Sequence, residues 1–96
     1  MAGELPTEHR ATIEIRNKLG LHARAAALLV QTVDRFQAEV TIAKDGESVN
    51  GRSIMGIMML AAEQGSSIEV VTSGPDAEAV LAAIRTLVDD RFHESE

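Results

Sequence analysis

The sequence predicts an α+β domain, an open-faced sandwich in which helices cover one face of a four-stranded sheet that is antiparallel or mixed. The apolar residues recur with periods that follow the order strand, helix, strand, strand, helix, strand, helix. Each predicted strand has one polar face, which is typical of an antiparallel or mixed sheet that is open to water on one side. Two of the helices carry clear apolar stripes, which suit them to cover the other side.

The first strand and the first helix are predicted from a change in periodicity. Residues 11–16 alternate, with Ile13 and Ile15 on the inward face. From residue 22 to about residue 36, apolar side chains recur at spacings of three and four, and a run of alanines raises the helix propensity. Residues 1–10 are mostly polar, and we expect them to form an N-terminal tail.

A two-residue β-hairpin is predicted at the Asp-Gly pair of positions 45–46, because both central residues of such a turn need a positive φ. This turn pairs Lys44 with Glu47 and sets Ile42 opposite Val49. Two apolar side chains then share one face, and an opposite-charge pair lies beside the turn.

The second half of the chain contains the remaining elements. Residues 53–60 are expected to form a short helix, in which the apolar residues are too numerous for one buried stripe. Residues 67–72 alternate as a fourth strand, and a third helix with a proline at its first position is predicted over residues 75–88. Residues 91–96 are expected to form a C-terminal tail, so the folded domain spans residues 11–90.

Composition excludes several classes of function. With 96 residues the chain makes one domain, and a deep catalytic cleft is not expected. A net charge of −6 and only two aromatic residues argue against binding to nucleic acid or to an anionic membrane. The absence of cysteine excludes disulfides, thiol catalysis and thiolate zinc sites. No apolar run is long enough for a membrane span or a signal region, so we expect a cytoplasmic protein without a metal or other cofactor.

One histidine lies where a helix is predicted to begin, directly after a glycine-bearing turn. Unpaired amides at a helix N-terminus favour negative charge, so a phosphate carried on the ring of His22 would be stabilised. Two positions further on, Arg24 offers planar donors to phosphate oxygens. The residues alone leave a plainer interpretation open, in which His22 only begins the helix and Arg24 is solvated.

The short helix carries two further candidates. The hydroxyl of Ser53 suits an N-cap, but it also suits phosphorylation, which would place charge beside an apolar patch. The patch consists of Ile54, Met55 and Met58. These side chains either pack in the core or form a flexible surface that meets several partners.

Together, the motifs Gly-Leu-His-Ala-Arg at residues 20–24 and Asn-Gly-Arg-Ser-Ile-Met-Gly at residues 50–56 resemble the HPr family, the histidine-containing phosphocarriers of the bacterial phosphotransferase system. The similarity covers residues 11–88 and implies an open-faced sandwich, in which three helices lie on one face of a four-stranded antiparallel sheet. It also implies that His22 accepts a phosphoryl group on Nδ1 from phosphorylated Enzyme I and passes it to a IIA component or a regulatory target. In this comparison Arg24 corresponds to the family's phosphate-contacting arginine.

The resemblance also implies roles outside the phosphoryl site. Ser53 corresponds to the serine that HPr kinase/phosphorylase modifies in some bacteria. The residues that match the family's docking surface, or flank it, are Ile54, Met55, Met58, Leu21 and Ala27. A protein that shows one small face to several partners is expected to be a monomer.

One position departs from the family pattern, and the sequence decides neither the branch of the family nor between the carrier function and two alternatives. Ala25 stands where the family usually has proline, and we expect it to loosen the first helical turn. Residues 17–20 and 74–76 look like the nitrogen-related branch, NPr, whereas residues 50–56 look like HPr that is regulated through serine. Two alternatives to the phosphocarrier function are also open. The protein could be a regulatory module that binds a small metabolite, or an interaction protein that is controlled only through Ser53.

Overall fold

The computed structural model describes residues 8–96 and contains one four-stranded antiparallel sheet with strand order β1-β4-β2-β3. The strands are β1 (Glu8–Glu14), β2 (Glu39–Lys44), β3 (Glu47–Asn50) and β4 (Ser67–Ser73). The helices are α1 (Ala23–Val33), α2 (Ile54–Met59) and α3 (Ala77–Asp89), followed by a short 3₁₀ helix, η1 (Arg91–His93). This arrangement confirms the predicted α+β open-faced sandwich.

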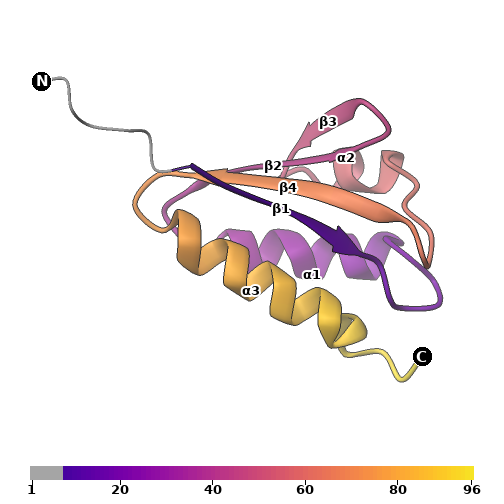
Figure 1. Ribbon diagram of the computed structural model, residues 1–96. Helices are drawn as coiled ribbons and strands as arrows, with labels where there is room; N and C mark the ends of the chain where they lie inside the picture. Colours follow the sequence, from indigo (N-terminus) through magenta and orange to yellow (C-terminus); the bar gives the residue numbers. More distant parts are fainter. Residues whose placement is uncertain (1–7) are drawn as a thin grey trace, which may run out of the picture.

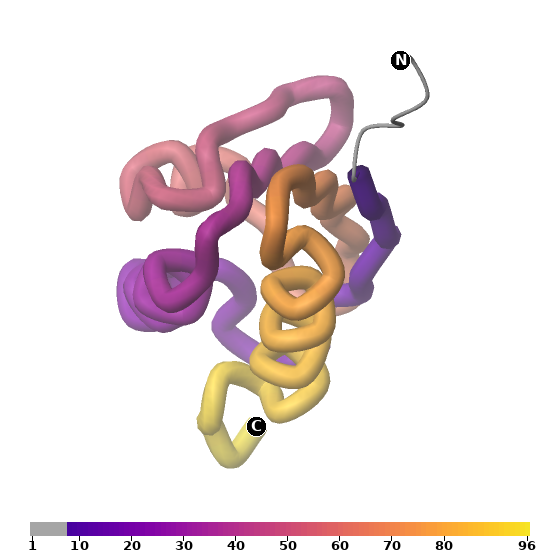
Figure 2. The backbone as a smooth tube through the Cα atoms, turned by 90° about the vertical axis from the view of Figure 1, so that its left-hand side faces the viewer, coloured from indigo at the N-terminus to yellow at the C-terminus, as the bar shows by residue number. Residues whose placement is uncertain are grey.

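The helices lie on one side of the sheet and leave its other face open. In Figure 1, α1 and α3 run beneath the strands, and Figure 2 shows these two helices side by side. Helix α2 packs against α1 and β3. The core between the layers is aliphatic, and its fully buried side chains include Leu29, Ile42, Ile57, Val70, Val80 and Ile84. The start of α1, helix α2 and the C-terminus all lie toward the same end of the sheet (Figure 1).

The predicted hairpin is confirmed in its turn and in its register. Asp45 and Gly46 have φ values of 51° and 86°, as a two-residue turn of this type requires. Ile42 lies opposite Val49, and Lys44 lies opposite Glu47. The predicted opposite-charge pair therefore lies beside the turn, and the ammonium group of Lys44 contacts Asp45, with 2.8 Å between Nζ and Oδ2.

The N-terminal boundary differs from the expectation. Strand β1 begins at Glu8, so residues 8–10 belong to the sheet rather than to a tail, and residues 1–7 of the expected tail lie outside the described residues. Glu8 pairs with Ser73 and Arg10 with Val71. This stretch is polar, so its sequence does not predict a strand. It forms one because it lies at the edge of the sheet, where β4 supplies its backbone hydrogen-bond partners.

Two helix boundaries also move. Helix α1 ends at Val33 instead of near residue 36. The next residues form tighter turns, in which Arg35 N–H donates to Thr32 O and Phe36 N–H donates to Val33 O. Helix α3 begins at Ala77, so Pro75 precedes the helix instead of opening it.

The C-terminal segment is not a free tail. Phe92 is fully buried in the core, and the turn that places it has positive φ at Arg91, Phe92 and His93. Because Phe92 anchors this segment, the residues that follow it are held against the body of the protein.

Candidate functional site

His22 is the N-cap of α1 and has an extended backbone, with φ −75° and ψ 179°. Its N–H donates to Gly20 O at 2.9 Å, and its carbonyl accepts from Ala26 N–H at 2.8 Å. The amides of residues 23–25 lie in the first helical turn and have no partner within the helix. The His22 side chain is 28% exposed. The ring is therefore open to a partner and lies beside unpaired donors.

Gly20 is required for this geometry because the chain passes very close to another backbone segment. Its φ is +68°, and a Cβ at this position would lie 2.4 Å from the carbonyl oxygen of Ala62. The same oxygen accepts the Leu21 N–H at 2.9 Å. The glycine thus allows the loop before His22 to lie directly against residue 62.

An unexpected carboxylate meets the His22 ring. Glu94 Oε2 lies 2.5 Å from His22 Nε2, although the two residues are 72 positions apart in the chain. Glu94 Oε1 accepts from Asn17 Nδ2 at 3.1 Å, and the same amide group donates to Gly20 O at 2.8 Å. Asn17 is fully buried, and the Glu94 side chain is only 10% exposed. Four residues thus form one connected network, the His22 cluster: Asn17, Gly20, His22 and Glu94.

Glu94 was missed at the level of sequence because it lies in the expected tail. A usable signal was Phe92, one of only two aromatic residues in the chain, since a large apolar side chain in a polar segment tends to anchor it. That signal predicts an ordered C-terminus but does not identify His22 as the partner of Glu94.

The pKa of the Glu94 carboxyl reflects opposing influences. Burial alone would raise the pKa of Glu94. Hydrogen bonds from His22 and Asn17, with electrostatic attraction to His22 and Arg24, outweigh burial and leave this pKa below its ordinary value. Glu94 is therefore ionised at neutral pH.

Arg24 is exposed in the first turn of α1, where no acidic residue is present. A cation at the positive end of a helix dipole is unfavourable by about 0.3–1 kcal/mol, so helix stability does not explain why an arginine occupies position 24. Arg24 lines an open hollow of about 320 Å³ together with Lys18, Leu19 and Glu94. The position suits contact with an anion held at the start of the helix.

Ala25, the residue that departs from the family pattern, is fully buried within α1. The helix begins regularly at Ala23 without the proline. The expected looseness of the first turn stays a prediction.

Ser53 and the apolar patch occupy the other candidate region. Ser53 is the N-cap of α2, and its Oγ accepts the Gly56 N–H at 2.9 Å. The side chains of Ile54, Met55 and Met58 are 40%, 67% and 36% exposed. Two further exposed apolar residues, Leu19 and Met59, were missed at the level of sequence.

The two residues expected to flank the patch differ from each other. Ala27 is half-buried in α1. Leu21 is only 4% exposed and packs in the hydrophobic core, so its expected place on a docking surface is wrong. Its position before the helix turns its side chain inward, and its N–H is bonded to Ala62 O.

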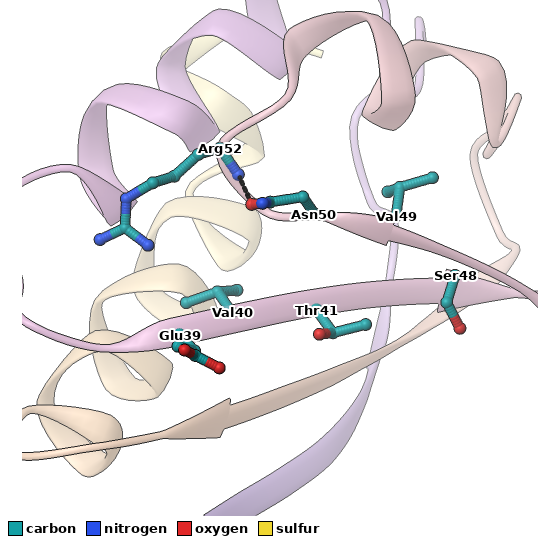
Figure 3. A pocket seen from close by; sticks show the side chains of 7 residues that line it. All are labelled: Glu39, Val40, Thr41, Ser48, Val49, Asn50 and Arg52. Carbon is teal, nitrogen blue, oxygen red and sulfur yellow. Dashed lines mark hydrogen bonds between the residues drawn. The ribbon is translucent and has the colours of Figure 1, made fainter.

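A larger hollow, of about 540 Å³, lies over β2 and β3 and contains no residue of the His22 cluster (Figure 3). Arg52 lines it, and its backbone N–H donates to Asn50 Oδ1 at 2.8 Å. The Arg52 guanidinium donates hydrogen bonds to backbone carbonyls that follow α1, to Ala38 O at 2.8 Å and to Phe36 O at 3.0 Å. Arg52 therefore stabilises the chain that follows α1, and its guanidinium does not point to a catalytic role for this hollow.

Residues 8–96 contain neither a cluster of metal-binding side chains nor a membrane-spanning helix. Within residues 8–96, no three histidine or acidic side chains are arranged to hold a metal ion. No helix in this same part of the chain is long and apolar enough to cross a membrane.

Comparison with known proteins identifies the family. The family model described as the PTS HPr component phosphorylation site matches residues 9–90. A phosphocarrier protein HPr of Xylella fastidiosa is 48% identical over 87 residues, which cover 91% of this chain and 96% of the relative. A phosphocarrier protein HPr of Neisseria meningitidis is 47% identical and covers 91% of this chain and 98% of its own length.

The fold agrees with these relatives. A crystal structure of HPr from Thermoanaerobacter tengcongensis superposes with a TM-score of 0.87 at 43% identity, and the match covers 92% of this chain and 99% of that one. The match of both sequence and fold runs almost from end to end, and it includes the helix start that carries His22. The chain therefore belongs to the HPr family of the phosphotransferase system.

Proposed function

We propose that this protein is a phosphoryl carrier in which His22 accepts a phosphoryl group from phosphorylated Enzyme I and passes it to IIA components. The observation that carries this proposal is a solvent-accessible histidine at the N-cap of α1, with unpaired amides and Arg24 beside it. The protein is consumed and regenerated in each cycle, so it acts as a carrier rather than an enzyme. We expect it to work in the cytoplasm as a monomer.

The chemistry needs one nucleophilic ring nitrogen. The lone pair of His22 Nδ1 forms a bond to phosphorus while the bond from phosphorus to the donor breaks, and that bond's electron pair stays with the donor. The phosphate oxygens then face the first amides of α1 and the Arg24 guanidinium, which favour negative charge. Transfer to a IIA component runs the same step with His22 as the donor.

Docking of both partners is proposed at the exposed apolar patch of Ile54, Met55 and Met58, with Ala27 at its margin. Methionine side chains are flexible and polarizable, so one surface can pack against several partners. Met59, in the same helix, is also exposed, as is Leu19 in the loop before His22.

Ser53 is proposed as a site of regulatory phosphorylation by an HPr kinase/phosphorylase. A phosphate on this residue would put negative charge directly beside Ile54 and weaken docking by acidic partners. Ser53→Asp should therefore slow phosphorylation at His22, whereas Ser53→Ala, which adds no charge, should not. Equal or faster phosphorylation of Ser53→Asp would rule out this regulation.

The carrier proposal is tested by intact-mass spectrometry after incubation with phosphoenolpyruvate and an Enzyme I from the same cell. Wild type should gain one phosphate that is lost in acid, and His22→Ala should gain none. His93→Ala is the matched control, because His93 is exposed but lies outside the His22 cluster, and it should behave as wild type. An adduct of normal yield on His22→Ala would contradict the proposal, because another residue would then carry the phosphate.

A further inference from the structure

We propose that Glu94 is a positioning residue for His22, whose carboxylate holds the ring in the tautomer that has its proton on Nε2. This inference rests on the proposed carrier function. Its consequence is that the lone pair of Nδ1 stays free to accept the phosphoryl group.

The tautomer follows from the contact between the two side chains. The Glu94 carboxylate lies 2.5 Å from Nε2, and an ionised carboxylate can only accept hydrogen bonds. Nε2 must therefore carry the proton that the two groups share. A neutral imidazole has one N–H, so Nδ1 is left with its lone pair. The lowered pKa of Glu94 supports the ionised form on which this assignment depends.

The carboxylate is held in place from three directions. Asn17, which is fully buried, donates to Glu94 Oε1 at 3.1 Å. Two residues before Glu94, the Phe92 side chain is fixed in the core. Two residues after it, the Glu96 carbonyl accepts the Lys18 N–H at 2.9 Å. The C-terminal segment is thus built to present one carboxylate to one histidine.

The same contact assists the transfer step. When Nδ1 bonds to phosphorus, the ring keeps its proton on Nε2 and becomes positively charged. A carboxylate beside that N–H stabilises the charge, as the aspartate does for the histidine of a hydrolase triad. Because Glu94 meets the opposite ring nitrogen, it does so without occupying the site of the incoming phosphoryl group.

The test compares Glu94→Gln, which keeps the shape and an acceptor oxygen but loses the charge, with Glu96→Gln. The control removes the same charge two residues away, from a side chain that contacts Lys18 instead of His22. Nitrogen-15 NMR of the neutral His22 ring should show the proton on Nε2 in wild type and in the control, and a mixture of tautomers in Glu94→Gln. The initial rate of phosphoryl acceptance should fall on the order of tenfold in Glu94→Gln and stay unchanged in the control.

The outcomes separate the two proposals. If wild type accepts no phosphoryl group, the carrier function fails, while the NMR comparison still decides the role of Glu94. If wild type is phosphorylated but Glu94→Gln keeps both the Nε2–H tautomer and the rate, the positioning role is overturned. An equal loss of rate in both variants would also overturn it, because the effect would then be one of net charge.

Discussion

Gly20→Ala should destabilise the protein strongly, because the added methyl group has no space and the backbone has the wrong sign of φ. The φ of +68° costs an alanine about 1–2 kcal/mol. The new Cβ would lie 2.4 Å from Ala62 O and 3.1 Å from Glu63 Cα, and both are backbone atoms that cannot rotate away. Moving them costs about 1–3 kcal/mol, and loss of the Leu21–Ala62 hydrogen bond adds about 1 kcal/mol.

The expected loss is therefore about 3–6 kcal/mol in the free energy of unfolding. Gly65→Ala separates the two causes, because Gly65 has a φ of +88° but no atom within 4 Å of the Cβ position. This control should lose only about 1–2 kcal/mol. Each kcal/mol shifts the Tm of a domain of this size by about 4–8 °C, so the two variants should differ by roughly 8 °C or more.

Urea and thermal denaturation of both variants and wild type measure this difference. Since Gly20 O also accepts the His22 N–H, the rate of phosphoryl acceptance by Gly20→Ala should fall even where the protein remains folded. If Gly20→Ala is no less stable than Gly65→Ala, the close approach to residue 62 does not exist in solution and the account of the loop is refuted.

Three other predictions concern the surroundings of His22. Phe92→Ala should lower the free energy of unfolding, measured by urea denaturation, by about 3–5 kcal/mol, and should release Glu94 from the His22 ring. A loss below about 1 kcal/mol would show that Phe92 does not anchor the C-terminal segment. Arg24→Ala should leave stability unchanged or raise it by about 0.3–1 kcal/mol, while phosphohistidine forms more slowly; clear destabilisation would mean that Arg24 serves the fold. Because the pKa of Glu94 is lowered below its ordinary value of 4.5, its contribution to stability is complete above that pH and is lost as the pH falls through the lower folded-state value. The difference in urea midpoint between wild type and Glu94→Gln should thus shrink on acidification below pH 4.5, and a constant difference would contradict the pKa assignment.

The elements that were predicted well depend on local chemistry. The hairpin was correct in turn and register because Asp45 and Gly46 specify both within a few residues. His22 was placed at the start of its helix because the turn, the alanine run and the apolar spacing all change there. Ser53 was correctly recognised as suited to an N-cap for the same kind of reason.

The elements that were missed depend on partners far away in the chain. Residues 8–10 are polar and become a strand only because β4 pairs with them. Glu94 lies in a polar segment, and its contact with His22 exists only once Phe92 is buried and α3 has crossed the sheet. Leu21 carries no local sign that its side chain turns into the core instead of joining the patch.

The central claim is that His22 both receives and gives away a phosphoryl group. The most direct test is to isolate the phosphorylated protein, remove Enzyme I and phosphoenolpyruvate, add a IIA component from the same cell, and follow both intact masses with time. The account predicts that this protein loses one phosphate while the IIA component gains one, faster than the phosphate is lost to water. A phosphate that stays on the protein, or that appears only in water, would show that His22 is modified without acting as a carrier.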